Sequence, residues 1–442
     1  MQPAKFLTGS ITRHVINMTT ASAVGLIMLF TSDLVDMFFL SQLGHQPLAA
    51  AVGFAGTLLF FATAACIGLQ VGMGALVARA LGASQRLQAG QLCTDVLLFS
   101  LFFSLLITAA FAFCIDELLI FIGASGNTLE YALSYSRILL LSTPFLAVGM
   151  CGSAALRSLG DAKRSMYVTI MGALVNVALD PLFIFTFGWG IEGAAWASFC
   201  SRIVLFVLAM YWLIKTHRLP QHPRWASFKT SIRPVSLIAG PAMLTSLATP
   251  LASTYVIKVM ATYGDQAVAA SAIIGRLIPV TFAVIFALSG AVGPIIGQNA
   301  GAGSYDRVRQ TVLSAMLLNV VYCLAAWLLL FLLKDIIVAV FDAEGETASL
   351  IIFYCQYLVG AFLFSGMLFV ANAGFNNLNR AYLATTFNFA KALLGVIPFV
   401  AIMSKYFGAP GVLTGEAVAA AVFAIAATVV LLRRIENLKN RL

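Results

Sequence analysis

Charged residues are scarce in this chain, because Asp, Glu, Lys and Arg together make up only 10% of its 442 residues. Hydrophobic residues make up 61%, and the mean hydropathy is +0.96. So few charges cannot cover the surface of a water-soluble protein of this length, which excludes a soluble protein with one core. The composition instead indicates a protein that crosses a membrane many times.

Histidine is also scarce, with four residues, and the seven cysteines show no paired spacing. The cysteines lie in or at the ends of apolar stretches, so we interpret them as packing residues and not as a disulfide or metal framework. No metal-ligand cluster and no clustered nucleophile and base can be assembled from the sequence. We therefore expect no enzyme activity, no cofactor and no firmly bound metal.

Apolar stretches long enough to cross a bilayer recur along the chain, without the alternation that marks the strands of a β-barrel. Continuous apolar runs favour helices, because a helix satisfies its own backbone hydrogen bonds in lipid. The sequence predicts an all-α integral membrane protein with twelve transmembrane helices, near residues 13–42, 48–78, 91–115, 128–156, 164–188, 190–215, 234–262, 267–297, 311–333, 347–375, 382–404 and 410–432.

Lysine and arginine lie mostly on one side of these predicted spans. If the amino terminus and the even-numbered connections share a side, the odd-numbered connections hold only Lys334 and Lys405. Positive residues accumulate in cytoplasmic loops, so we expect a multi-pass membrane protein with both termini in the cytoplasm. The net charge of +9 then reflects topology, and we expect the lipid bilayer, and no nucleic acid, as a partner.

The chain is an internal duplication with six spans in each half. Each half therefore enters the membrane in the same direction, which is typical of transporters whose halves rock around a central cleft. We predict two pseudo-symmetric six-helix bundles around such a cleft, an amino-terminal lobe at 1–217 and a carboxy-terminal lobe at 218–442, with the polar segment 216–234 as the linker. The matched positions include Gly74 and Gly293, Gly82 and Gly301, Leu159 and Leu378, Gly190 and Gly408, and Gly193 and Gly411.

The two halves differ in the acids of their spans. Asp180 lies deep in the apolar segment MYVTIMGALVNVALDPLFIFTFG and aligns with about Ile397, and Asp36 aligns with Val256. A carboxylate in hydrocarbon is costly and is a functional candidate by default. Whatever these acids do is therefore expected to take place in the first lobe.

Four polar residues of the first lobe are expected at one depth in the membrane. Asp36, Tyr135, Asp180 and Ser198 lie roughly 10 to 12 Å below the outer surface, counted from the extracellular ends of their spans at about 1.5 Å per residue. Asn176 lies one turn deeper, on the same helix face as Asp180 because of its i, i+4 spacing. We predict that these five residues form one site.

Ordinary structural roles compete with this interpretation. Asp36 lies far along its span, where an outer-interface residue is expected, and a tyrosine such as Tyr135 is usually an interface anchor. Ser198 alone is more often a close-packing contact between helices. Pro181 favours a site instead, because it has no N–H and so leaves the carbonyl oxygen of Val177 available to a cation, a water or a hydroxyl.

The chain resembles the multidrug and toxic compound extrusion (MATE) transporters. The resemblance rests on VDMFFLSQLG with Asp36, LRSLGDAKR after the fourth span, and ALVNVALDPLFIF with Asn176 and Asp180, together with the 6+6 layout. The lack of acids at the aligned position of span 7 and throughout span 10 resembles the DinF-like branch, whose coupling acids lie in the first lobe. The resemblance implies a hydrogen-bonded network of Asp36, Tyr135, Asn176 and Asp180, with Ser198 where the family more often has threonine.

One departure from the family concerns the first span. A proline often found early in this helix would fall near Ala21, and the span contains no proline. Any bending of the helix must then rely on Gly25 or on packing.

The resemblance implies a monomeric secondary active transporter that exports lipophilic organic cations by cation antiport. Two close carboxylates in a low-dielectric pocket resist ionising together, so at least one is expected to hold a proton near neutral pH. Drug and proton then compete for the same charge, and a proton gradient drives export. Sodium is the alternative coupling ion, because Asp36, Asn176, Asp180 and Ser198 form an all-oxygen set. We favour protons, because the pair offers two titratable groups.

A lipid-linked-sugar flippase of related architecture is the less favoured function. It would need cationic groups in the cleft to hold a pyrophosphate, whereas the deepest charges in this chain are acidic. Among the basic residues, Arg276 and Lys391 are candidates to line the second lobe, and Glu416 is a candidate partner.

Overall fold

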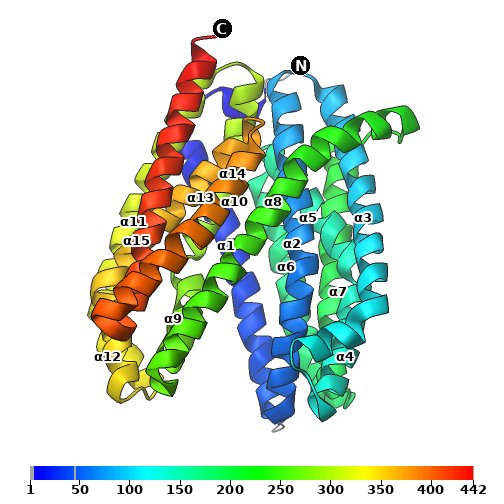
Figure 1. Cartoon of the computed structure of the whole chain (residues 1–442). Coiled ribbons are helices and arrows are strands. Elements are labelled where there is room, and N and C mark those ends of the chain that lie inside the picture. Colours follow the sequence, from blue (N-terminus) through cyan, green and yellow to red (C-terminus); the bar gives the residue numbers. More distant parts are fainter. Residues whose placement is uncertain (1–3, 44–45, 442) are drawn as a thin grey trace. The chain divides into compact units, whose positions relative to one another are not determined.

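The computed structural model describes residues 4–43 and 46–441, which form helices joined by short connections (Figure 1). The α-helices are α1 (Ile11–Gln42), α2 (Gln46–Gly82), α3 (Arg86–Phe121), α4 (Gly126–Leu141), α5 (Thr143–Ser158), α6 (Ala162–Pro181), α7 (Gly190–Tyr211), α8 (Trp225–Met260), α9 (Asp265–Thr281), α10 (Ala283–Gly301), α11 (Tyr305–Val340), α12 (Gly345–Phe353), α13 (Phe362–Asn377), α14 (Ala381–Ala390) and α15 (Ile397–Lys439).

Short segments of other helix types interrupt or extend these α-helices. Three are 3-10 helices, namely η1 (Lys5–Leu7), η4 (Ala261–Tyr263) and η6 (Val359–Ala361). Four are π-helices, namely η2 (Leu182–Thr186), η3 (Trp212–His217), η5 (Tyr354–Leu358) and η7 (Lys391–Val396). Single π turns of this kind are frequent at functional sites.

The predicted all-α membrane fold is confirmed. Among the described residues, ten helices are long and apolar enough to cross a membrane, or up to eleven if the bent pair α4 and α5 forms one span. The last of these stretches, Ala381–Lys439, is broken at Gly408, whose backbone is not helical at φ 65° and ψ −145°. This break separates the eleventh and twelfth predicted spans.

The helices form two compact units, which we describe separately. The first unit is Val24–Met243, and the second combines the chain up to Ala23 with the chain from Leu244 onward. Helices α1 and α8 therefore contribute to both units. The two predicted lobes are defined by the sequence repeat and not by packing, and their boundaries at 217 and 218 stay a prediction.

Matched glycines produce the same close helix crossing in each half of the chain. Gly190 and Gly408 both have positive φ, at 54° and 65°. A β-carbon on Gly193 would lie 2.7 Å from a main-chain carbonyl of η2, and one on Gly411 would lie 2.1 Å from a main-chain carbonyl oxygen of α15. Only glycine allows two backbones to approach this closely. The repeat therefore preserves a turn and a crossing in both halves.

In the first unit, α3 holds the linker and the start of α8. The Thr94 hydroxyl donates to the carbonyl of Gln221 and accepts from its N–H, both at 2.9 Å. The buried carboxylate of Asp95 accepts hydrogen bonds from Ser227 and Ser231, both at 2.7 Å. Helix α8 therefore begins within the predicted linker 216–234, and its serines satisfy Asp95.

Asp161, in the LRSLGDAKR segment, joins the start of α6 to the end of η3. Its carboxylate accepts hydrogen bonds from the main chain and side chain of Arg164, and His217 Nε2 lies 2.8 Å from Oδ2. Burial alone would raise the pKa of Asp161, but the hydrogen bonds from His217 and Arg164 outweigh burial and hold that pKa well below its usual range. This carboxylate is therefore ionised at neutral pH and caps the helix.

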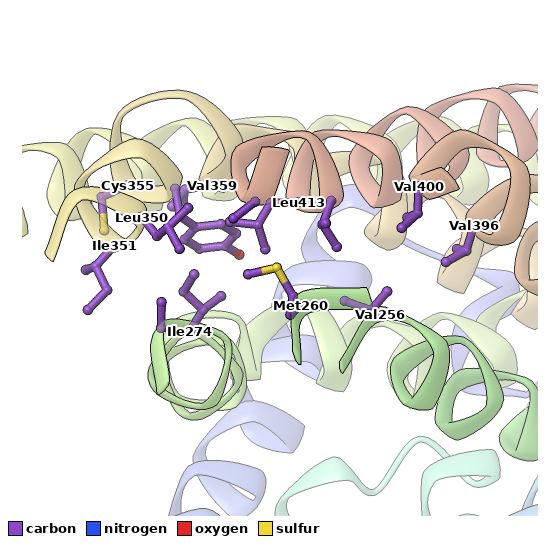
Figure 2. Close-up of a cluster of buried hydrophobic side chains, with 14 of the residues drawn as sticks. Val256, Met260, Ile274, Leu350, Ile351, Cys355, Val359, Val396, Val400 and Leu413 are labelled. Atoms are coloured by element: carbon purple, nitrogen blue, oxygen red, sulfur yellow. The ribbon is translucent and has the colours of Figure 1, made fainter. Parts of the chain in front are cut away.

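The second unit has an apolar core between α8, α9, α12 and α15. Figure 2 shows Met260 and Ile274 pointing toward Leu350 and Leu413. These four side chains are at most 7% exposed. In a membrane, where lipid is as apolar as these residues, such contacts stabilise the unit by dispersion and close packing.

We expect Gly193→Ala and Gly411→Ala each to lower the free energy of unfolding by about 1 to 3 kcal/mol, because a main-chain segment must move to admit the new β-carbon. The measurement is thermal unfolding of the purified protein in detergent. Gly56→Ala in α2 is the control, since a β-carbon there meets nothing within 4 Å. Melting temperatures equal to that of the control in both variants would contradict the close crossing.

Candidate functional site

Asn176 on α6 is the centre of a polar network in the first unit. Its Nδ2 lies 3.3 Å from Asp180 Oδ1 and 3.4 Å from Ser198 Oγ. Its Oδ1 accepts a hydrogen bond of 2.7 Å from Ser32 Oγ. Asn176 is 7% exposed and Asp180 is fully buried. One amide therefore links α1, α6 and α7.

The sequence places Asn176 and Asp180 on the same face of α6, because they are four residues apart. Pro181 is the last residue of α6, and the π-helical segment η2 follows directly. The proline has no N–H, and the change of helix type at this point loosens the regular backbone pairing. Carboxylate, amide and irregular backbone thus occur within two turns, and the availability of the Val177 carbonyl stays a prediction.

Asp36 on α1 lies beside this network and is 9% exposed. Asp36 and Asp180 lie close enough to interact electrostatically. Asp36 Oδ1 and Asp180 Oδ2 are both buried atoms without a hydrogen-bond partner in the described part of the chain. Two unpartnered carboxylate oxygens are costly in a low-dielectric interior unless a proton or a cation neutralises them.

Tyr135 on α4 is 6% exposed and packs within an apolar cluster that includes Leu40 and Ile184. It interacts electrostatically with both Asp36 and Asp180, so it lies near the acids. No hydrogen bond between described residues joins its hydroxyl to the network. Of the predicted residues, Asn176, Asp180 and Ser198 are joined by hydrogen bonds, whereas Asp36 and Tyr135 are brought close without one.

Sequence reasoning missed Ser32, which is 2% exposed and donates to Asn176. Its position carries a signal, since it lies four residues before Asp36 and therefore on the same face of α1. Gly25, farther back on this helix, packs against α6: a β-carbon there would lie 3.3 Å from Thr169. Close packing at Gly25 thus holds a helix that has no proline against α6.

Sequence reasoning also missed the role of Arg202 on α7. Its Nη1 donates to the Leu139 carbonyl at 3.0 Å and to Ser142 Oγ at 2.7 Å. At Ser142 the chain bends by 47° between α4 and α5, so this guanidinium supports polar groups at the bend. Arg202 also interacts electrostatically with Tyr135 and Asp33. It therefore places a positive charge near Tyr135 and Asp33 and fixes the helix that carries Tyr135.

A separate groove of about 480 Å³ in the first unit is lined mostly by apolar residues such as Leu97, Leu101 and Phe206. It contains none of the predicted site residues. Within the described residues, no group of three or more His, Cys, Asp or Glu could hold a metal ion. The candidate site is therefore the buried polar network and the acid beside it.

A family model described as MatE matches this chain twice, over residues 21–182 and again over 241–402. The chain belongs to the MATE family. It is therefore a multi-pass membrane transporter and not an enzyme. Two successive matches to one model also agree with the internal duplication inferred from the sequence.

Relatives match almost the whole of this MATE chain. The FAD transporter of Shewanella oneidensis is 28% identical over 413 residues, which cover 92% of this chain and 91% of the relative. The multidrug export protein MepA of Staphylococcus haemolyticus is 24% identical over 442 residues, covering 99% and 96%. A multidrug resistance MATE family transporter solved in an outward-facing conformation superposes with a TM-score of 0.93 at 23% identity, covering 100% and 99%. That likeness supports the fold.

We expect Arg202→Gln to lower the free energy of unfolding by about 1 to 3 kcal/mol, because the buried Leu139 carbonyl and Ser142 hydroxyl lose their donor. Arg137→Gln is the control. Arg137 pairs with Asp116 at 2.9 Å, but both side chains are more than half exposed, at 59% and 52%, so its loss should cost about 0 to 1 kcal/mol. Thermal unfolding measures both, and equal melting temperatures for the two variants would refute the supporting role of Arg202.

Proposed function

We propose that this MATE protein is a secondary active efflux transporter that exports lipophilic organic cations in exchange for protons. The observation that carries the proposal is the pair of buried, unpartnered oxygens, Asp36 Oδ1 and Asp180 Oδ2. These atoms can accept a proton or face a positive charge, and both events compete for the same two carboxylates. The relatives described as multidrug export proteins support the export of drugs.

The exchange needs no covalent chemistry. A bound organic cation is favoured when the carboxylates are ionised, and protons arriving from outside neutralise them and weaken its binding. Asn176, held by Ser32 and Ser198, keeps Asp180 in place through both states. An exchange that moves net positive charge inward gains about 2.3 kcal/mol per charge per 100 mV of membrane potential.

The orientation of Asn176 supports protons over sodium. The amide turns its NH2 group toward Asp180 and Ser198 and its oxygen toward Ser32. Sodium requires oxygen ligands, so a sodium site at Asp36, Asn176, Asp180 and Ser198 would need the amide to flip and to give up the bond from Ser32. A proton requires no such change.

Export of an anionic flavin dinucleotide is the second candidate, because the FAD transporter of Shewanella oneidensis matches nearly the whole chain. Its phosphates would be repelled by ionised Asp36 and Asp180. Arg202 is a cation in the same unit, but its Nη1 already donates to Leu139 and Ser142. We therefore place organic cations first.

We also propose that the protein acts as a monomer in the bacterial inner membrane with both termini in the cytoplasm. The strong asymmetry of lysine and arginine between the two sets of connections supports this orientation.

Asp36→Asn and Asp180→Asn are each expected to abolish export of a cationic fluorescent dye, because an amide neither titrates nor carries the charge that binds the cation. Export is measured in cells that express each variant, and size-exclusion profiles show that the variants are folded. Asp116→Asn, which changes an exposed acid, is the control and should export normally. Full export by either site variant would count against the proposal.

Proteoliposomes separate the coupling ions and the substrates. Dye release driven by a pH gradient alone is the expected result, and release that requires a sodium gradient assigns coupling to sodium instead. The same vesicles loaded with FAD test the second candidate. Release of FAD without release of dye would replace organic cations by the dinucleotide as the substrate.

Ser32→Ala is expected to slow dye export about two- to tenfold, because the loss of one buried hydrogen bond of about 0.5 to 1.5 kcal/mol leaves Asn176 less well held. Thr31→Ala is the matched control, since the Thr31 hydroxyl is exposed and donates to Ile27 of its own helix. Initial rates of export at several dye concentrations give the comparison. Identical rates in the two variants would remove Ser32 from the site.

A further inference from the structure

The second unit contains a cavity of about 110 Å³ that the proposed coupling site does not use. Its lining combines a lysine, a glutamate, a tyrosine and a serine with apolar side chains. The polar residues are Lys391, Glu416, Tyr354 and Ser365, and the apolar ones include Phe362 and Ile278. They come from α9, η5, α13, η7 and α15. Membrane-embedded charges that line a cavity are candidates for ligand contacts.

The sequence repeat relates this cavity to the site in the first unit. In the alignment register that matches Leu159 with Leu378, Tyr135 matches Tyr354. In the register that matches Gly190 with Gly408, Ser198 matches Glu416. The repeat therefore matches polar positions as well as structural glycines. In the register that matches Asp180 with about Ile397, Asn176 matches Leu393. Lys391 lies two residues before Leu393.

Both units contain π-helical segments, although these do not fall at matched positions of the repeat. In the first unit η2 begins two residues after Asp180. In the second, Lys391 begins the π-helical segment η7, and Tyr354 begins η5. Single π turns are rare in proteins as a whole, but those that occur are frequently found at functional sites. Two of the four polar lining residues stand at such turns.

Lys391 and Glu416 lie close enough to interact electrostatically, and Glu416 interacts with Tyr354 in the same way. The ion pairs within 4.0 Å between described residues do not include Lys391 with Glu416. Both side chains are only partly buried. A purely structural pair would be closed and well bonded, whereas these opposite charges border an open space.

We propose that this cavity is a second ligand site, and that it binds a small amphiphilic zwitterion whose carboxylate faces Lys391 and whose ammonium group faces Glu416. The inference does not rest on the cation–proton exchange of the first unit. The apolar body of the ligand packs against Ile274, Ile278 and Phe362.

The opposite charges of Lys391 and Glu416 favour a ligand that itself carries one positive and one negative charge. The two opposite charges neutralise each other in the low-dielectric interior, and a ligand with a single charge would satisfy one of them and leave the other unpaired. A ligand with both charges pairs its carboxylate with Lys391 and its ammonium group with Glu416. Neither side chain is then left without an opposite charge. The small volume limits the ligand to a molecule of about the size of an amino acid.

Three phenylalanine compounds share one body and differ only in charge. We expect the full chain in nanodiscs to bind radiolabelled phenylalanine, a zwitterion, in equilibrium dialysis. Phenylalanine amide, a cation, and N-acetylphenylalanine, an anion, should each compete at least tenfold less well than unlabelled phenylalanine. Absence of saturable binding, or equal competition by either analogue, would overturn the proposal without any mutation.

The variants test the two charges directly. Lys391→Met combined with Glu416→Gln removes both charges together, and it should weaken phenylalanine binding at least tenfold while cationic dye export continues. The exchange Lys391→Glu with Glu416→Lys keeps a neutral pair and should bind phenylalanine better than the uncharged double variant. Lys405→Met, at an exposed position of α15, is the control. Unchanged binding in the uncharged double variant, or equally weak binding in both double variants, would refute the assignment.

Discussion

A carboxylate inside a membrane protein must be supported by the protein itself, because neither lipid nor bulk water solvates it. Asp180 receives that support from the amide of Asn176, which is held in turn by hydroxyl groups on two other helices. This arrangement fixes α1, α6 and α7 around one acid. Asp36 then lies beside a preformed polar network without a hydrogen bond to it, and we propose that this acid responds to the coupling ion.

The two halves of the duplication share their structural glycines but differ in their polar side chains. The glycines that allow the tight turn and the close crossing recur in both halves, and the structure shows why, because a side chain at Gly193 or at Gly411 would strike a main-chain carbonyl. Polar side chains carried on that scaffold have diverged. A serine in the first half stands where a glutamate stands in the second, and the acid of α6 corresponds to isoleucine.

The sequence predicts the spans and much of the site, because apolar length and the i, i+4 spacing of Asn176 and Asp180 are local properties. Ser32 escapes prediction, since a serine in an apolar helix is more often a packing residue. The role of Arg202 depends on the bend at Ser142 and on the contact of α7 with that bend, which are tertiary properties. The sharing of α1 and α8 between two compact units is likewise a tertiary property, which a sequence repeat does not contain.

The difference in charge between the two halves is consistent with two different roles, energy coupling in the first half and ligand selection in the second. A pair of carboxylates can change its net charge by gaining protons, so it can couple binding to a gradient of protons. A lysine and a glutamate that face one cavity start at zero net charge, and titrating either one alone leaves the other uncompensated. Such a pair is suited to recognising a ligand of matching, opposite charges and is poorly suited to driving transport. On the same scaffold, energy coupling is therefore expected where the acids are alike in sign, and ligand selection where the charges are opposite.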